Sequence, residues 1–174
     1  NNPFDYWTSM PSDTIVVFNA VSNIKYTTFR MIVSSSGPST AAGVTGLNYI
    51  GFPPPPPKQV TPLTTNFSSN NITISGNSGV YAYQNGSYTT SSSSFLDGNW
   101  QGYKAFNNGP DKFPSWLSNG NTNKYNGSDG VYNGSTSTIA NGTSLLGEWV
   151  QIVLPYGLSI VKYQLSSKNA YYLG

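Results

Sequence analysis

Side chains capable of acid–base or nucleophilic chemistry are scarce in this chain. The sequence contains no His and no Cys, so the commonest general base, the thiolate nucleophile and the usual zinc ligands are missing. Hydrolysis of a glycosidic bond needs two carboxyl groups that face each other across a cleft. The spacing of the carboxylates selects no such pair: they are Asp5, Asp13, Asp97, Asp111, Asp129 and Glu148. The sequence therefore predicts a protein that is not an enzyme.

Aromatic rings are the stronger candidates for a functional site. The chain has 13 Tyr and 4 Trp, and most of its polar side chains are Ser, Thr and Asn. Rings with amides and hydroxyls beside them could bind a glycan. Three tyrosines lie in turn-rich segments and are the expected ligand contacts: Tyr103, Tyr125 and Tyr132. Ordinary packing is the alternative for each, and Trp116 and Trp149 are predicted to lie in the core.

The charge of the chain argues against two classes of partner. Only 8% of the residues are charged and the net charge is +2, without a cluster of Lys or Arg. Nucleic-acid binding through phosphate contacts is therefore not expected. The sequence also lacks the run of about 18 apolar residues that would predict a membrane span. A neutral, hydroxyl-rich surface should bind its partner with little dependence on salt.

Six Asn-x-Ser/Thr sequons bear on the compartment. They would carry glycans if the chain passed through a secretory route. The sequons begin at Asn66, Asn71, Asn85, Asn126, Asn133 and Asn141. The lack of Cys does not decide the compartment, because a domain of this size can be stable without disulfides.

The elements that must position these residues are strands. Thr, Val, Ile and Tyr favour strands, Asn-Gly pairs favour tight hairpins, and no segment has a sustained helical period. The sequence predicts almost no helix. Five strands are expected most clearly, over residues 14–18, 27–33, 47–52, 149–154 and 160–165, with Pro155 ending the fourth.

Two stretches resemble a known family. Residues 146–166 contain a Gly-Glu-Trp turn, an apolar strand, a Pro break and a second strand, and Lys104-Ala-Phe-Asn-Asn-Gly with Trp116 precedes them. This arrangement resembles the middle of a discoidin-like (coagulation factor 5/8 type C) domain. The resemblance implies an all-β, antiparallel jelly-roll β-sandwich whose usual work is binding.

The order of the segments is unusual for that family. Tyr26-Thr-Thr-Phe-Arg and residues 47–51 resemble its closing strands. Residues 1–52 are thus predicted to be closing strands, 53–58 a polyproline linker, and 59–174 the opening and middle strands. The chain could be a piece of a tandem array, or its halves could complete one sandwich in permuted order. We favour one sandwich, because half of one would leave open edges and an uncovered apolar face.

Calcium is the one cofactor that the resemblance raises. Many sugar-binding discoidin-like modules hold a structural Ca²⁺ in the loop that matches residues 105–111. Here Asn107 stands at the family's Asp position, and Asp111 follows four residues later. Ca²⁺ favours six to eight oxygen ligands, including charged ones. The prediction is therefore no required cofactor, with Asn107 and Asp111 as alternative Ca²⁺ ligands and Glu148 as a structural hydrogen-bonding residue.

These features predict a non-catalytic structural or binding module of a virion or extracellular surface assembly. The Cys-free composition, rich in Ser, Thr and Asn, resembles that of structural proteins of large DNA viruses and of surface adhesins. Its partners would be neighbouring structural proteins of a shell or surface array, as for a minor capsid component. The alternative is a carbohydrate-binding adhesion module for host or cell-surface glycans.

Overall fold

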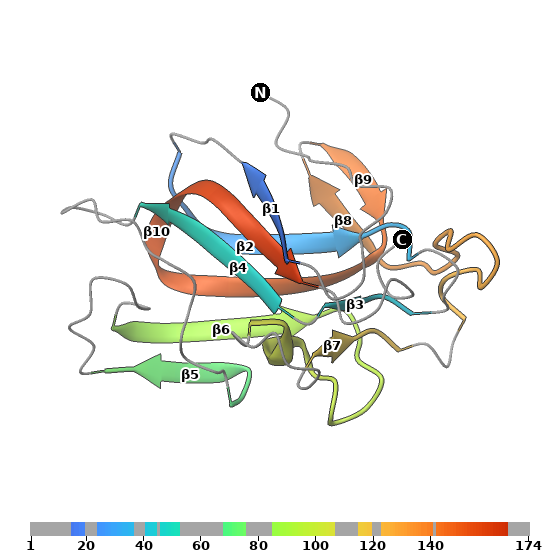
Figure 1. Ribbon diagram of the computed structural model, residues 1–174, viewed down its shortest axis with the longest axis horizontal. Coiled ribbons are helices and arrows are strands. Elements are labelled where there is room, and N and C mark those ends of the chain that lie inside the picture. The colour runs from blue at the N-terminus through green and yellow to red at the C-terminus, as the bar shows by residue number, and fades with distance from the viewer. Residues whose placement is uncertain are drawn as a thin grey trace.

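The computed structural model describes residues 15–19, 24–36, 41–44, 46–52, 68–75, 85–106, 115–119, 123–140 and 142–166. Within these ranges most residues lie in antiparallel strands (Figure 1), and the single helical element is the short 3-10 helix η1 (Gly102–Phe106). The prediction of an all-β protein with almost no helix is confirmed. The polyproline segment 53–57 lies outside the described residues.

The strands follow the β-branched and aromatic runs of the sequence. In chain order they are β1 (Ile15–Asn19), β2 (Tyr26–Val33), β3 (Gly43–Val44), β4 (Gly46–Phe52), β5 (Asn71–Ile74), β6 (Gly86–Ser92), β7 (Trp116–Leu117), β8 (Ser137–Ala140), β9 (Thr143–Leu146) and β10 (Glu148–Ser166). The three strands predicted before the prolines are confirmed within a residue at each end.

Strand β10 organises the largest sheet. It pairs with β2 and β6 along its first part and with β1 and β4 along its second part, always antiparallel. The expected break at Pro155 is wrong, because the strand continues through it for 19 residues in all. Pro155 costs only a local irregularity: pairing with β2 stops at Val153 and resumes at Leu158. A proline without an N–H is tolerated at such a bulge.

The segments on either side of the prolines share one core. Phe29 of β2 lies opposite Ile152 of β10, and Leu47 of β4 lies opposite Leu165. All four belong to one cluster of buried side chains that also contains Trp116. The described residues before and after the prolines therefore complete one sandwich-like core between them, as predicted.

The two strand tryptophans occupy different environments. Trp116 is fully buried, and its indole Nε1 donates to the carbonyl of Ser94 at 2.8 Å. Trp149 is only half-buried, so its expected place in the core is wrong. Side chains alternate along a strand, and Val150 and Ile152 face the core, which turns Trp149 to the outer face of the sheet.

This difference predicts unequal costs for the two tryptophans. Trp116→Ala should lower the free energy of unfolding by about 3–5 kcal/mol, because it empties a large buried site. Trp149→Ala should cost about 1–2 kcal/mol, because the ring packs on one side only. Urea unfolding monitored by circular dichroism gives both values. Equal losses would contradict the assigned faces of β7 and β10.

Candidate functional site

The start of β10 positions two polar clusters on opposite faces of the sheet. Successive side chains of a strand point to opposite faces. Glu148 therefore points inward, where its side chain is fully buried. Trp149 and Gln151 point outward, next to Arg30 of the neighbouring strand β2.

The carboxylate of Glu148 is saturated with hydrogen bonds. Its Oε1 accepts from the ammonium of Lys124 at 2.9 Å, the hydroxyl of Tyr132 at 2.8 Å and that of Thr136 at 3.1 Å. Its Oε2 accepts from the hydroxyls of Ser93 and Ser94. Burying a charge is costly unless it is paired and hydrogen-bonded, and this arrangement meets both conditions.

These bonds decide the charge state of the carboxylate. Burial by itself would raise the pKa of Glu148, but hydrogen bonds from Ser94, Lys124, Ser93 and Tyr132 outweigh it. The pKa falls from 4.5 to about 2. Glu148 is thus ionised at neutral pH and has no open side for a substrate. The prediction of a structural hydrogen-bonding residue is confirmed.

Gly147 explains the Gly-Glu-Trp turn that leads into β10. Its φ of +154° lies in the region that favours glycine, and a Cβ there would approach the carbonyl oxygen of Val33 to 2.4 Å. Its N–H donates to the carbonyl of Thr136 at 3.0 Å. The glycine lets the chain pass close to β2, which brings Glu148 over its donors.

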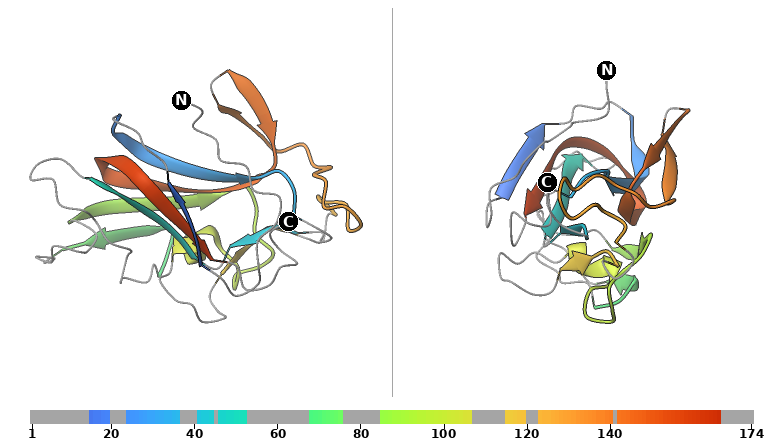
Figure 2. Two further views of the ribbon diagram at one scale, coloured as in Figure 1. Left: turned by 45° about the horizontal axis from the view of Figure 1, so that its top comes forward. Right: turned by 90° about the vertical axis from the view of Figure 1, so that its right-hand side faces the viewer.

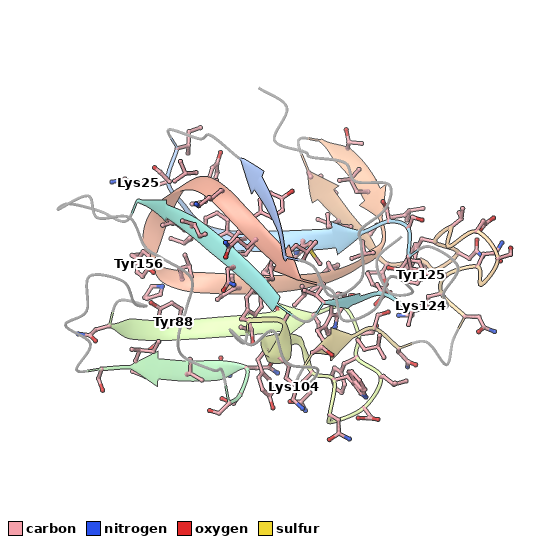
Figure 3. All side chains as sticks on the ribbon, in the orientation of Figure 1. Lys25, Tyr88, Lys104, Lys124, Tyr125 and Tyr156 are labelled. Carbon is pink, nitrogen blue, oxygen red and sulfur yellow. The ribbon has the colours of Figure 1, made fainter. Side chains whose placement is uncertain are left out.

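Tyr125 and Tyr132 belong to this buried cluster and not to an exposed loop. Tyr125 is fully buried; its hydroxyl donates to the carbonyl of Val33 at 2.7 Å and accepts from the N–H of Glu148 at 3.2 Å. The two rings pack edge to face with centroids 4.9 Å apart. Figure 3 shows Tyr125 beside Lys124 at one end of the molecule. The expectation that these two rings face a ligand is corrected, because both are buried and each hydroxyl bonds to a buried group.

The outer cluster consists of Arg30, Trp149, Gln151 and Thr138, and we call it the Arg30 cluster. The guanidinium carbon lies 4.0 Å from the centre of the Trp149 ring. Arg30 Nε donates to Gln151 Oε1 at 2.9 Å, and Nη1 donates to Thr138 Oγ1 at 2.8 Å. Partial burial lowers the pKa of Arg30, yet a guanidinium stays charged in proteins. Side chains from β2, β8 and β10 thus hold one exposed cation.

Polar side chains continue this face across the sheet. The pairing register places Arg30, Gln151 and Ser91 side by side on three strands. A second row crosses four strands and contains Thr28, Val153, Thr89 and Asn71. Apart from Val153, both rows present hydroxyl, amide or guanidinium groups.

The β8–β9 hairpin is the second exposed feature. Ala140 pairs with Thr143, and Gly142 between them has a φ of 77°, as expected for a predicted Asn-Gly turn. The hairpin projects from the curved sheet (Figure 2). Ile139 and Leu146 lie on the same hairpin face and are 78% and 52% exposed. Thr138, on the other face, contacts Arg30.

The remaining sequence-predicted residues are dispersed. Tyr103 is half-buried in η1, with the ammonium of Lys104 lying 5.8 Å from its ring centre. Asn107, Asp111, Asn66 and Asn141 lie outside the described residues. The other sequons are in the described part: Asn71, Asn85 and Asn133 are exposed and Asn126 is half-buried. Sequence reasoning missed Arg30, although its place next to Phe29 in a strand implied an outward direction.

The described part of the chain contains neither a metal-binding cluster nor a membrane-spanning helix. There, no three acidic side chains come together as a potential metal site. In the same ranges, no helix is long and apolar enough to cross a membrane. The Ca²⁺ alternative at Asn107 and Asp111 stays a prediction, because both residues lie outside these ranges.

Comparison with known proteins identifies no family for this chain. No protein-family model matches the chain, and neither a curated protein nor a solved structure matches it. The likeness to discoidin-like domains therefore rests on the motifs quoted above, and the site rests on its own geometry.

The buried carboxylate predicts a specific response to acid. A lowered native pKa contributes stability that is present above the unfolded-state pKa near 4.5 and is lost as pH falls towards about 2. Glu148→Gln should remove that part of the acid sensitivity. It should also cost about 3 kcal/mol at pH 7, because an amide puts an N–H against hydroxyl and ammonium donors.

Urea unfolding of both proteins between pH 2 and pH 7 measures the effect. Asp129→Asn is the matched control, since this exposed carboxylate accepts only from the nearby N–H of Val131. Equal pH profiles for the wild type and Glu148→Gln would show that Glu148 is not the linked group.

Proposed function

We propose that the chain is a non-catalytic, discoidin-like jelly-roll module of a virion or extracellular surface assembly. Its work is to attach to a neighbouring structural protein of that assembly through the β8–β9 hairpin. The observation that carries this proposal is the exposed apolar face of the hairpin, with Ile139 at 78% and Leu146 at 52% exposure.

The hairpin has the properties of a contact element. Single exposed apolar residues are ordinary on a protein surface, but here two lie diagonally on one small face. Ser137 and Ser144, the other residues of that face, are also exposed. Full burial of each aliphatic side chain by a partner would contribute roughly 1.5–3 kcal/mol. A two-stranded ribbon also offers backbone edges to a partner strand.

The core supports a scaffold role over a catalytic one. Glu148 is a buried carboxylate, and it accepts five side-chain hydrogen bonds that come from three separate segments. Two of the tyrosines expected to bind a ligand are buried in the same cluster. These groups hold the strands and the 123–136 segment together, which suits a module whose surface makes the contacts.

Glycan binding is the second candidate, and the Arg30 cluster is the observation that favours it. An aromatic ring, a cation, an amide and hydroxyls lie together on the outer face of the sheet. In this version the contact is made by side chains of β2, β8 and β10, and not by the predicted Tyr103, Tyr125 and Tyr132. The two candidates use different faces of the hairpin and can be separated by mutation.

The assembly function predicts that the hairpin touches another protein. With a photo-cross-linking amino acid at position 139, the chain should link to a neighbouring structural protein in the native assembly. Ile139→Ser with Leu146→Ser should weaken binding to that protein by at least about tenfold, because apolar burial is lost. The binding should change little between low and high salt. Titration calorimetry with the purified partner measures both.

A matched control keeps the test specific. Val131→Ser removes another exposed aliphatic side chain, 52% exposed, outside the hairpin and should leave binding unchanged. Melting temperatures of all variants should stay near that of the wild type, since exposed substitutions rarely alter stability. The hairpin contact would be overturned if position 139 formed no cross-link to another protein in the native assembly. Binding that the double substitution left unchanged would overturn it too.

A further inference from the structure

The guanidinium of Arg30 is held in place without being neutralised. Trp149 supports one side of it at 4.0 Å, and two strands supply the acceptors Gln151 Oε1 and Thr138 Oγ1. Neither acceptor carries charge. Among the described residues the one ion pair joins Lys124 to Glu148, so no described carboxylate pairs with Arg30. The cation is therefore preorganised, and no counter-charge for it lies within the described ranges.

The hydrogen bonds of the cluster leave donors facing outward. Gln151 Oε1 and Thr138 Oγ1 each already accept from Arg30. An amide keeps an NH₂ group, and a hydroxyl keeps its O–H. Arg30 still has Nη2 and one N–H of Nη1, for which the described residues offer no acceptor. A surface that presents a fixed cation and several unused donors suits an anionic, acceptor-rich group.

We propose that the Arg30 cluster binds the carboxylate of an acidic sugar. Because Nε is engaged by Gln151, the carboxylate would take the open end of the guanidinium formed by Nη1 and Nη2. Charge-assisted, two-pronged bonds of this kind are the strong ones. Thr138, which already accepts from Nη1, lies beside this end, and its hydroxyl can donate to the carboxylate or the sugar ring. Gln151 holds the opposite edge through Nε, which fixes the orientation of the fork. The inference rests on the glycan-binding candidate above.

The surroundings favour a sugar over an acidic peptide. Ser91, Thr89, Thr28 and Asn71 extend from the cluster across the outer face, as the pairing register shows. Their hydroxyl and amide groups match the hydroxyls of neighbouring sugar units. The exposed aliphatic residues that a protein partner would bury lie on the opposite face of the hairpin.

Trp149 acts here as a positioning residue. The guanidinium occupies a face of its ring, so that face is closed to a sugar. A cation over an indole is stabilised by about 0.5–1 kcal/mol at exposed sites. Trp149 therefore holds the Arg30 fork in one orientation, and its loss should weaken binding without removing the charge.

Titration calorimetry with defined sugars tests the proposal on the whole chain. The probes are a galacturonic acid tetramer and sialyllactose, with the carboxyl-reduced tetramer and lactose as neutral counterparts. The wild type should bind the carboxylated probes at least about tenfold more tightly than the neutral ones, and less tightly at high salt. Arg30→Met should abolish this preference. Arg30→Lys should weaken it, because an ammonium lacks the planar fork.

Lys25→Met is the matched control, since it removes one exposed positive charge at the end of the molecule opposite Lys124 (Figure 3). It should bind like the wild type. If Arg30→Met does not fold, Gln151→Leu serves instead and should lower affinity for the carboxylated probes several-fold. The hairpin double variant should bind the sugars normally, because its substitutions lie on the other face.

The possible contrary results separate this proposal from the functions it rests on. Equal binding of carboxylated and neutral sugars would overturn the carboxylate site and leave glycan binding standing. Binding of sulfated heparin oligosaccharides alone would overturn the choice of carboxylate. Failure to bind any sugar at millimolar concentration, or binding of a poly-glutamate peptide only, would overturn both the site and the glycan candidate.

Discussion

A buried carboxylate holds this molecule together at one end. Glu148 receives donors from residues 93–94, from Lys124 and from residues 132–136, so segments with little regular structure are anchored to the first residue of β10. Removing the ammonium of Lys124 would leave the carboxylate without its counter-charge in the interior, where an unpaired charge is costly. Two neighbouring features make this arrangement possible. Gly147 lets the chain pass close to the carbonyl of Val33, and Tyr125 and Tyr132 hydrogen-bond to Glu148.

The same constraint shapes the outer surface. Because β10 must place Glu148 inward, Trp149 and Gln151 must point outward. The antiparallel register then sets Gln151 opposite Arg30 of β2. The hairpin that enters β10 at Gly147 brings Thr138 to the guanidinium. An interior electrostatic requirement thus explains why an exposed cation is held by three strands, and why the hairpin's apolar face points away from it.

The two proposed binding surfaces differ in physical character. The hairpin face offers aliphatic side chains, for which affinity comes from buried area and depends little on salt. The Arg30 cluster offers a fixed charge and directed donors, for which affinity depends on geometry and is screened by salt. In the proposed surface assembly, one face would hold the module in place and the other would bind outward, without competition between them.

The sequence by itself determined the strand-forming runs, the near absence of helix, the shared core and the structural role of Glu148. The strands and the lack of helix follow from local propensity and apolar patterns, which are readable along the chain. The shared core followed from the complementary resemblance of the two segments to one sandwich, and the role of Glu148 from its place in a Gly-Glu-Trp turn. The tertiary structure decided which face each residue occupies. Tyr125 and Tyr132 looked like loop residues, yet long-range hydrogen bonds to Val33 and Glu148 bury them. Arg30 looked like an isolated charge, because its partners Thr138 and Gln151 are 108 and 121 residues away in the chain.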